Sequence, residues 1–344
     1  MTLDQIKETL KGPDYDFLGT DGHLGENIMI LTLGGSHAYG TSTDTSDLDI
    51  RGCALNRKRE ILTGEKFEQV SDEQTDTVIY SFNKLIGLLS GCNPNTIELL
   101  GNRPEHYLYL SEAGRELLDK AHMFLSKRAV YTFGGYANQQ LRRLENKSAR
   151  LVGQAENEQH ILKTIEHACY DWKARYFPMP EDAVRLYTDR AVCEELESEI
   201  FMDITLRHYP LRDYAGLWSE MQSVVRSYAR TGKRNQNAIG HGKLGKHMMH
   251  LIRLYMMCLD ILEQERIVTY REKEHDLLME IRAGKYLDGA GQPIPEFFEM
   301  VDEYERRLEY AGENTSLPEQ PDEEEIRDFV ASVNERVVRG EIGN

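Results

Sequence analysis

The chain has 344 residues, of which 40% are hydrophobic, and its formal net charge at pH 7 is -17. This length exceeds what one hydrophobic core normally supports, so we expect two domains. The negative charge argues against a protein that coats DNA, because a polyanion would repel it. The hydrophobic runs are too short to cross a bilayer, and five widely spaced cysteines favour reduced thiols over disulfides or a zinc site. The composition therefore predicts a cytoplasmic protein without membrane contact.

Short hydrophobic and β-branched runs in the first third of the chain predict a mixed α/β domain. Strands are expected at residues 28–33, 47–55 and 76–81, and the last of these leads into a helix near residues 82–89. Residues 94–101 are compatible with either a short strand or a helical turn, and the pattern leaves both open.

From about residue 111 onward, hydrophobic residues recur every three or four positions, which is the period of an amphipathic helix. Near the end, an acidic stretch interrupted by prolines precedes a last short helix. We therefore predict an α+β protein with three parts. A small mixed-sheet domain spans residues 1–110, a larger α-helical domain spans 111–312, and an acidic linker with a short C-terminal helix spans 313–344.

Two aspartates lie two residues apart in the string DLDIRG. Alternate residues of a strand point to the same face, so we expect Asp47 and Asp49 to project together. Adjacent carboxylates repel each other unless a cation lies between them, and Mg²⁺ prefers such hard oxygen ligands. We interpret the pair as ligands of two divalent ions, Mg²⁺ or Mn²⁺, in phosphoryl chemistry. The alternative is a solvated pair on an edge strand, which is the commoner situation for an isolated D-x-D.

A glycine–serine turn precedes the two aspartates. In the string GGS, Gly35 allows the backbone to approach a phosphate closely, and Ser36 adds a hydroxyl donor. Tyr39, a few residues later, is a candidate for stacking on a base. A plain turn would explain the glycines by themselves, but a turn next to two carboxylates predicts a site for the triphosphate of a nucleotide.

A second candidate region is rich in cations. Residues 221–259 contain no aspartate or glutamate but seven lysines and arginines. If residues 242–254 are helical, Lys246, His250 and Arg253 fall at positions i, i+4 and i+7 on one face. They could bind the β- and γ-phosphates and neutralise the charge that develops on pyrophosphate. A solvated stripe on a core helix is the alternative.

The string GGSHAYGTSTDTSDLDIRG resembles the nucleotidyltransferases of the DNA polymerase β superfamily. Together with NPNTIELL, GKHMMHLIRLYMMCLDIL and LLMEIRAGKY, it is similar to one branch in particular, the predicted nucleotidyltransferases associated with RNA ligase. The resemblance covers roughly residues 28–286. It implies a third catalytic carboxylate, which the N-P-N-x-x-E string assigns to Glu98. The residues alone leave Asp76, at the start of a predicted strand, as a rival.

The resemblance also implies a reaction. An acceptor hydroxyl would attack the α-phosphate of a nucleoside triphosphate and release pyrophosphate, with both metals held by Asp47, Asp49 and Glu98. The association with RNA ligase suggests an acceptor on RNA, such as a tRNA or an RNA end. A protein side chain in a toxin or regulatory system is an alternative acceptor, and a non-catalytic protein that binds nucleotides or RNA ends is a further alternative. The sequence carries no indication of an oligomeric state.

Overall fold

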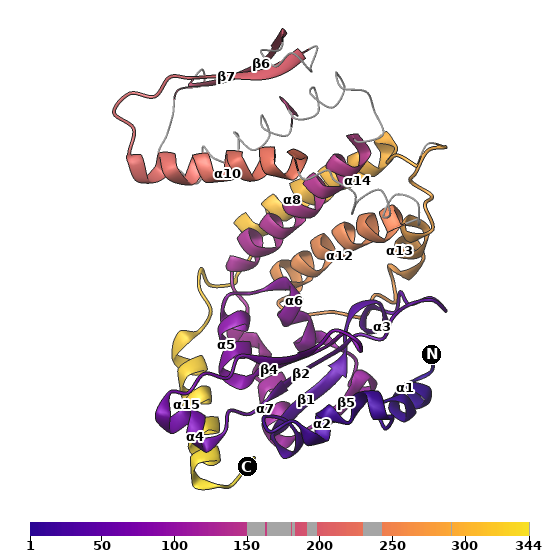
Figure 1. Cartoon of the computed structure of the whole chain (residues 1–344), viewed down its shortest axis with the longest axis vertical. Coiled ribbons are helices and arrows are strands. Elements are labelled where there is room, and N and C mark those ends of the chain that lie inside the picture. The colour runs from indigo at the N-terminus through magenta and orange to yellow at the C-terminus, as the bar shows by residue number, and fades with distance from the viewer. Residues whose placement is uncertain are drawn as a thin grey trace. The chain divides into compact units, whose positions relative to one another are not determined.

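The computed structural model describes residues 1–149, 162–163, 180, 183–190, 198–229, 243–289 and 291–343 (Figure 1). The chain forms two compact units. The first unit comprises Met1–Ala137, Met249–Ala283 and Pro295–Asn344, and the second comprises Asn138–Met248 and Gly284–Ile294. The domain boundaries at residues 110 and 312 stay predictions.

A five-stranded mixed sheet lies in the first unit, with the order β3-β4-β2-β1-β5. The strands are β1 (Ile28–Leu33), β2 (Ile50–Ala54), β3 (Gln69–Asp72), β4 (Thr77–Ser81) and β5 (Tyr107–Leu110). β1 pairs antiparallel with β2 and β5, β2 pairs parallel with β4, and β3 pairs antiparallel with β4. All six residues of β1 are buried, which explains why all of them except Thr32 are hydrophobic.

The second predicted strand starts later than expected. β2 begins at Ile50, which pairs with Leu33 of β1 and Thr77 of β4. β1 ends at Leu33 because Gly34 and Gly35 turn the chain into a helix, so the ladder between β1 and β2 ends at Ile50, beyond which only the Gly34 N–H donates to the Asp49 carbonyl. Asp47 and Asp49 consequently lie in an irregular segment just before the strand, and the prediction of a strand from residue 47 is wrong.

The helices confirm the α+β architecture. The α-helices of the first unit are α1 (Leu3–Thr9), α2 (Phe17–Thr20), α3 (Gly35–Tyr39), α4 (Lys58–Thr63), α5 (Phe82–Ser90), α6 (Pro94–Ile97), α7 (Glu112–Asp119), α13 (His275–Arg282), α14 (Pro295–Asn314) and α15 (Glu323–Arg339). Its 3₁₀ helices are η1 (Pro13–Tyr15), η2 (Gly25–Asn27), η3 (Glu98–Gly101), η4 (Pro104–His106) and η5 (Ala121–Phe124). Two long helices, α8 (Arg128–Ala149) and α12 (Lys243–Gln264), contribute to both units. None of the described helices has the length and hydrophobicity needed to cross a bilayer.

Residues 94–101, which the sequence pattern left open, are helical. The Asn93 side chain accepts a hydrogen bond from the backbone of Asn95, and Pro94 occupies the first helical position. Both features favour the start of a helix, because an asparagine cap satisfies a free N–H and proline has none to satisfy. This start places Glu98 at the first residue of η3.

The second unit contains a hairpin that the helical periodicity did not predict. β6 (Val184–Arg190) and β7 (Ser198–Ile204) pair antiparallel and are followed by α10 (Leu211–Ala229). Tyr187 and Phe201 lie opposite each other and stack, with their ring centroids 6.0 Å apart. Such cross-strand aromatic pairs stabilise hairpins. Part of the acid-free stretch, including Arg230, Lys233, Arg234 and His241, lies outside the described residues.

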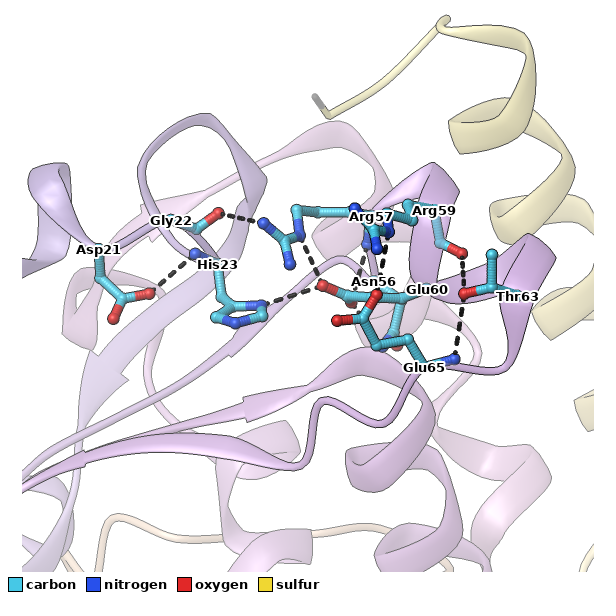
Figure 2. Close-up of polar contacts among 9 residues, drawn as sticks. All are labelled: Asp21, Gly22, His23, Asn56, Arg57, Arg59, Glu60, Thr63 and Glu65. Carbon is cyan, nitrogen blue, oxygen red and sulfur yellow. Dashed lines mark hydrogen bonds and ion pairs between the residues drawn. The ribbon is translucent and has the colours of Figure 1, made fainter.

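A buried glutamate connects the N-terminal segment to the end of β2 (Figure 2). The side chain of Glu60 is 1% exposed, and it accepts hydrogen bonds from Nε of Arg57 at 2.5 Å and Nδ2 of Asn56 at 3.3 Å. Nδ1 of His23 lies 3.0 Å from the same carboxylate. Because the carboxylate is surrounded by donors, its negative charge is satisfied despite burial.

Glu60→Gln is expected to destabilise the fold by about 1–3 kcal/mol at neutral pH, because Arg57 loses its charged partner. Burial raises the pKa of Glu60, but the hydrogen bonds from Arg57 and Asn56 outweigh burial and bring the net pKa below its usual value. A carboxyl with a lowered folded pKa stabilises above its unfolded pKa, near 4.3, and loses that contribution as the pH falls through the folded value. The difference in unfolding free energy between wild type and variant, measured in urea, should therefore be constant above about pH 5 and shrink below about pH 4. A difference that persists unchanged at about pH 3 would contradict this account.

Candidate functional site

The turn between β1 and α3 is packed against Asp49 and Arg51. Gly35 has a φ of +50°, in the left-handed region that favours glycine. A Cβ atom on Gly35 would lie 1.8 Å from Oδ2 of Asp49, and one on Gly34 would lie 2.7 Å from Cγ of Arg51. Because Gly35 has no side chain, the Asp49 carboxylate can lie against it, and the Arg51 side chain can lie against Gly34 in the same way. The structure thus brings Gly35 and Asp49, two residues singled out from the sequence, into direct contact.

The two aspartates differ in their surroundings. Asp47 is exposed, whereas the side chain of Asp49 is 18% exposed and its Oδ1 lies 3.4 Å from Nη2 of Arg51. In the described part of the chain, no three His, Cys, Asp or Glu side chains are grouped closely enough to hold a metal ion. Mg²⁺ in nucleotide sites is usually held by one or two carboxylates, with substrate phosphates and water completing its shell. Asp47 and Asp49 fit such an ion by their donor chemistry, and Gly35 leaves the space that the Asp49 carboxylate occupies.

Glu98 faces Tyr39 and lies within electrostatic reach of Arg253. The buried hydroxyl of Tyr39 donates a hydrogen bond to Oε2 of Glu98, and the Thr269 hydroxyl donates to the Glu98 carbonyl at 2.7 Å. Burial raises the pKa of the Glu98 carboxyl, and Arg253 and the Tyr39 hydroxyl offset part of that rise. A carboxylate with a raised pKa is better suited to accept a proton near neutral pH.

Of the three predicted phosphate-binding residues on α12, Arg253 lies within electrostatic reach of Glu98, and His250 contacts Arg253. The guanidinium of Arg253 lies over the Tyr39 ring, 3.3 Å from its centroid, and Arg253 is only 7% exposed. Its Nη2 is 2.8 Å from Nδ1 of His250. Lys246 is exposed and belongs to the second unit. Contact of these residues, or of Gly35 and Ser36, with a nucleotide stays a prediction.

Tyr39 is not placed for stacking on a base. Arg253 covers one face of its ring, its hydroxyl is bonded to Glu98, and the residue is 1% exposed. Its backbone carbonyl also accepts a hydrogen bond from Arg271 at 3.2 Å. The segment that contains Arg271 and Thr269 therefore holds Tyr39 and Glu98 together. This segment follows α12 and has no motif of its own, so its role could not be predicted from the sequence.

Arg51 bridges Asp49 and Asp76, the rival third carboxylate. Nη2 of Arg51 lies 3.1 Å from Oδ1 of Asp76, and Nη1 donates to the Asp76 carbonyl at 2.5 Å and the Ile50 carbonyl at 3.0 Å. The side chain of Asp76 is 55% exposed. Asp76 is thus an ion-pair partner of Arg51 at the edge of the site.

Arg282, the last residue of α13, holds the loop that leads to Asp47. Its guanidinium donates to the carbonyl of Thr41 and lies 3.3 Å from the hydroxyl of Thr43 and 3.2 Å from that of Ser46. Three acceptors of one loop therefore share one planar cation, which restricts the segment immediately before the aspartates.

Arg282→Ala is expected to lower the rate of nucleotide transfer about tenfold, since the loop before Asp47 loses three hydrogen bonds. Arg282→Lys should not restore the rate, because a single ammonium cannot replace the planar fork. Initial rates at saturating nucleotide measure the effect. Arg306→Ala is the matched control, since Arg306 is exposed and its Nε donates within its own helix to Asp302. Equal losses in the two alanine variants, or full rescue by lysine, would exclude this role for Arg282.

Comparison with known proteins finds a family that is similar to the N-terminal part of the chain. Residues 14–167 match the RNA repair pathway DNA polymerase beta family. The chain is also 23% identical over 317 residues to the uncharacterized 38.9 kDa protein in the nrdC-mobD intergenic region of Enterobacteria phage T4, covering 83% of this chain and 91% of that protein. No solved structure gives a significant match. The predicted resemblance to polymerase-β-like nucleotidyltransferases associated with RNA ligase is thereby confirmed.

Proposed function

We propose that this chain, whose residues 14–167 match the RNA repair pathway DNA polymerase beta family, transfers a nucleoside monophosphate from a nucleoside triphosphate to an acceptor hydroxyl. The family supports a polymerase-β-like nucleotidyltransferase in RNA repair. The single observation that carries the chemistry is the packing of Gly35 against Asp49. It joins a turn suited to phosphates to a carboxylate suited to their metal.

This arrangement supports the following roles for the side chains. Bound Mg²⁺ or Mn²⁺ would neutralise the phosphates and lower the pKa of the acceptor hydroxyl. We propose that Asp47 and Asp49 hold the metals and that Glu98, which is not grouped with them in the described residues, would join them on metal binding or accept the acceptor's proton. We further propose that the triphosphate is bound by Gly35, Ser36, Lys246, His250 and Arg253. Pyrophosphate leaves as the acceptor oxygen bonds to the α-phosphorus, so the protein supplies position and charge without a covalent intermediate.

Glu98→Gln is expected to lower kcat by about 100-fold or more, because an amide can neither accept a proton nor neutralise a cation. Asp76→Asn should keep kcat within about threefold of wild type at saturating metal, since Asp76 contacts Arg51 and not the reacting groups in this proposal. Initial rates and thermal unfolding of both variants test the assignment. The reverse pattern, with transfer lost only in Asp76→Asn, would make Asp76 the third carboxylate.

We propose RNA as the acceptor, because the matching family is described by an RNA repair pathway. The net charge of -17 favours a protein or a short RNA over long duplex DNA. Apparent affinity for an RNA acceptor should fall steeply with salt, whereas a protein acceptor need not show such a slope.

Label transfer tests the proposed function as a whole. Purified protein with Mg²⁺ or Mn²⁺ receives each α-labelled nucleoside triphosphate, with total RNA, tRNA and a cell lysate as acceptors. The double variant Asp47→Ala/Asp49→Ala is the blank. Label that moves to RNA in the wild type alone supports the proposal, and label on a protein identifies the alternative acceptor. Metal-dependent nucleotide binding without any transfer would instead indicate a non-catalytic nucleotide-binding protein.

A further inference from the structure

We propose that Arg51 and Asp76 together set the affinity of Asp49 for a divalent metal ion. Arg51 pairs with Asp49 while no metal is bound. When an ion binds Asp49 instead, Arg51 stays paired with Asp76. This inference rests on the proposed function, because it requires a metal at Asp49.

The first observation is that the Arg51 guanidinium lies closer to one of its two carboxylate partners than to the other. Nη2 of Arg51 lies 3.1 Å from Asp76 and 3.4 Å from Asp49. Nη1 is held on the Asp76 side by the carbonyls of Asp76 and Ile50. Of the two ion pairs, the one with Asp49 is thus the longer, and it can break while the three other contacts of the guanidinium remain.

The second observation is that the positive charge cannot easily move away from Asp49. Arg51 is 20% exposed, and its side chain fills the space that Gly34 leaves, as Asp49 fills that of Gly35. A divalent ion that binds Asp49 therefore comes close to the guanidinium, and two cations at such a distance repel each other. Asp76 pairs with the guanidinium and so neutralises part of its charge, and its exposed position lets it do so without losing its own hydration.

The backbone conformation of Asp76 allows its replacement by asparagine. Its φ is +46°, in the left-handed region that aspartate and asparagine both tolerate. Asp76→Asn therefore keeps the carbonyl that accepts from Nη1 of Arg51 and removes only the charge.

The experiment is an Mn²⁺ titration of the full chain, followed by the electron paramagnetic resonance of free Mn²⁺. Arg51→Gln should bind Mn²⁺ about fivefold more tightly than wild type, because a repelling charge is gone. Asp76→Asn should bind about threefold more weakly, because Arg51 then pairs more strongly with Asp49. The double variant Arg51→Gln/Asp76→Asn should match Arg51→Gln, since Asp76 acts only through Arg51.

The controls separate this inference from the proposed function. Asp49→Asn should lose the Mn²⁺ site, and Arg57→Gln, which breaks the ion pair with Glu60 at the other end of β2 (Figure 2), should leave the affinity unchanged. Weaker binding in both Arg51→Gln and Asp76→Asn, or additive effects in the double variant, would overturn the inference and leave the metal site standing. A wild-type protein without Asp49-dependent Mn²⁺ binding would overturn the metal site and the inference together.

Discussion

Asp49→Asn is expected to lower kcat for nucleotide transfer by about 1,000-fold, which corresponds to about 4 kcal/mol of lost transition-state stabilisation. Asparagine has nearly the same size, so it still fits against Gly35. Arg51 keeps its contacts with Asp76 and is not left as an unpaired charge. The substitution therefore removes a negative charge from the site at little cost to the fold.

Single-turnover transfer of label from the α-phosphate measures this loss without interference from product release. Asp44→Asn is the matched control, because Asp44 is exposed in the same loop, between the turn and the two aspartates. It should retain wild-type rates, and both variants should unfold near the wild-type temperature. Substantial activity in Asp49→Asn with an intact fold would show that Asp49 does not hold a catalytic metal.

Parts of the fold were predictable because their pattern is local. β1 coincides with its hydrophobic run at residues 28–33, and α5 follows β4 as the sequence predicted. The start of β2 was wrong because a strand's length depends on its partners, and β1 ends at Leu33. The hairpin of β6 and β7 was missed because three- and four-residue hydrophobic spacing dominates its surroundings.

The candidate site was likewise predictable only where its pattern is local. Gly35 and Asp49 could be found because the turn and the D-x-D lie within one short stretch of sequence. The contacts that arrange them join distant residues: Arg51 and Asp76 are 25 positions apart, Tyr39 and Glu98 are 59 apart, and Ser46 and Arg282 are 236 apart. No periodicity or spacing rule connects such pairs, since they meet only when the chain is packed.

Gly35→Ala is expected to reduce transfer by about 100-fold or more, through two separable effects. The left-handed conformation strains any residue with a Cβ by about 1–2 kcal/mol. In addition, the new methyl would lie 1.8 Å from Oδ2 of Asp49, so the carboxylate must move. Gly64→Ala is a control with the same backbone strain, because Gly64 has a φ of +69° and nothing within 4 Å of the added Cβ.

Comparing Gly35→Ala with Gly64→Ala separates the effect of the contact with Asp49 from that of backbone strain. Both variants should lose stability in urea, but only Gly35→Ala should lose transfer and weaken Mn²⁺ binding. If Gly35 served the phosphates alone, Gly35→Ala would raise the KM for nucleotide and leave Mn²⁺ binding as in Gly64→Ala. Weaker Mn²⁺ binding in Gly35→Ala would instead show that the glycine shapes the carboxylate. The turn and the aspartate would then act as one site, because a single methyl group on one disturbs the other.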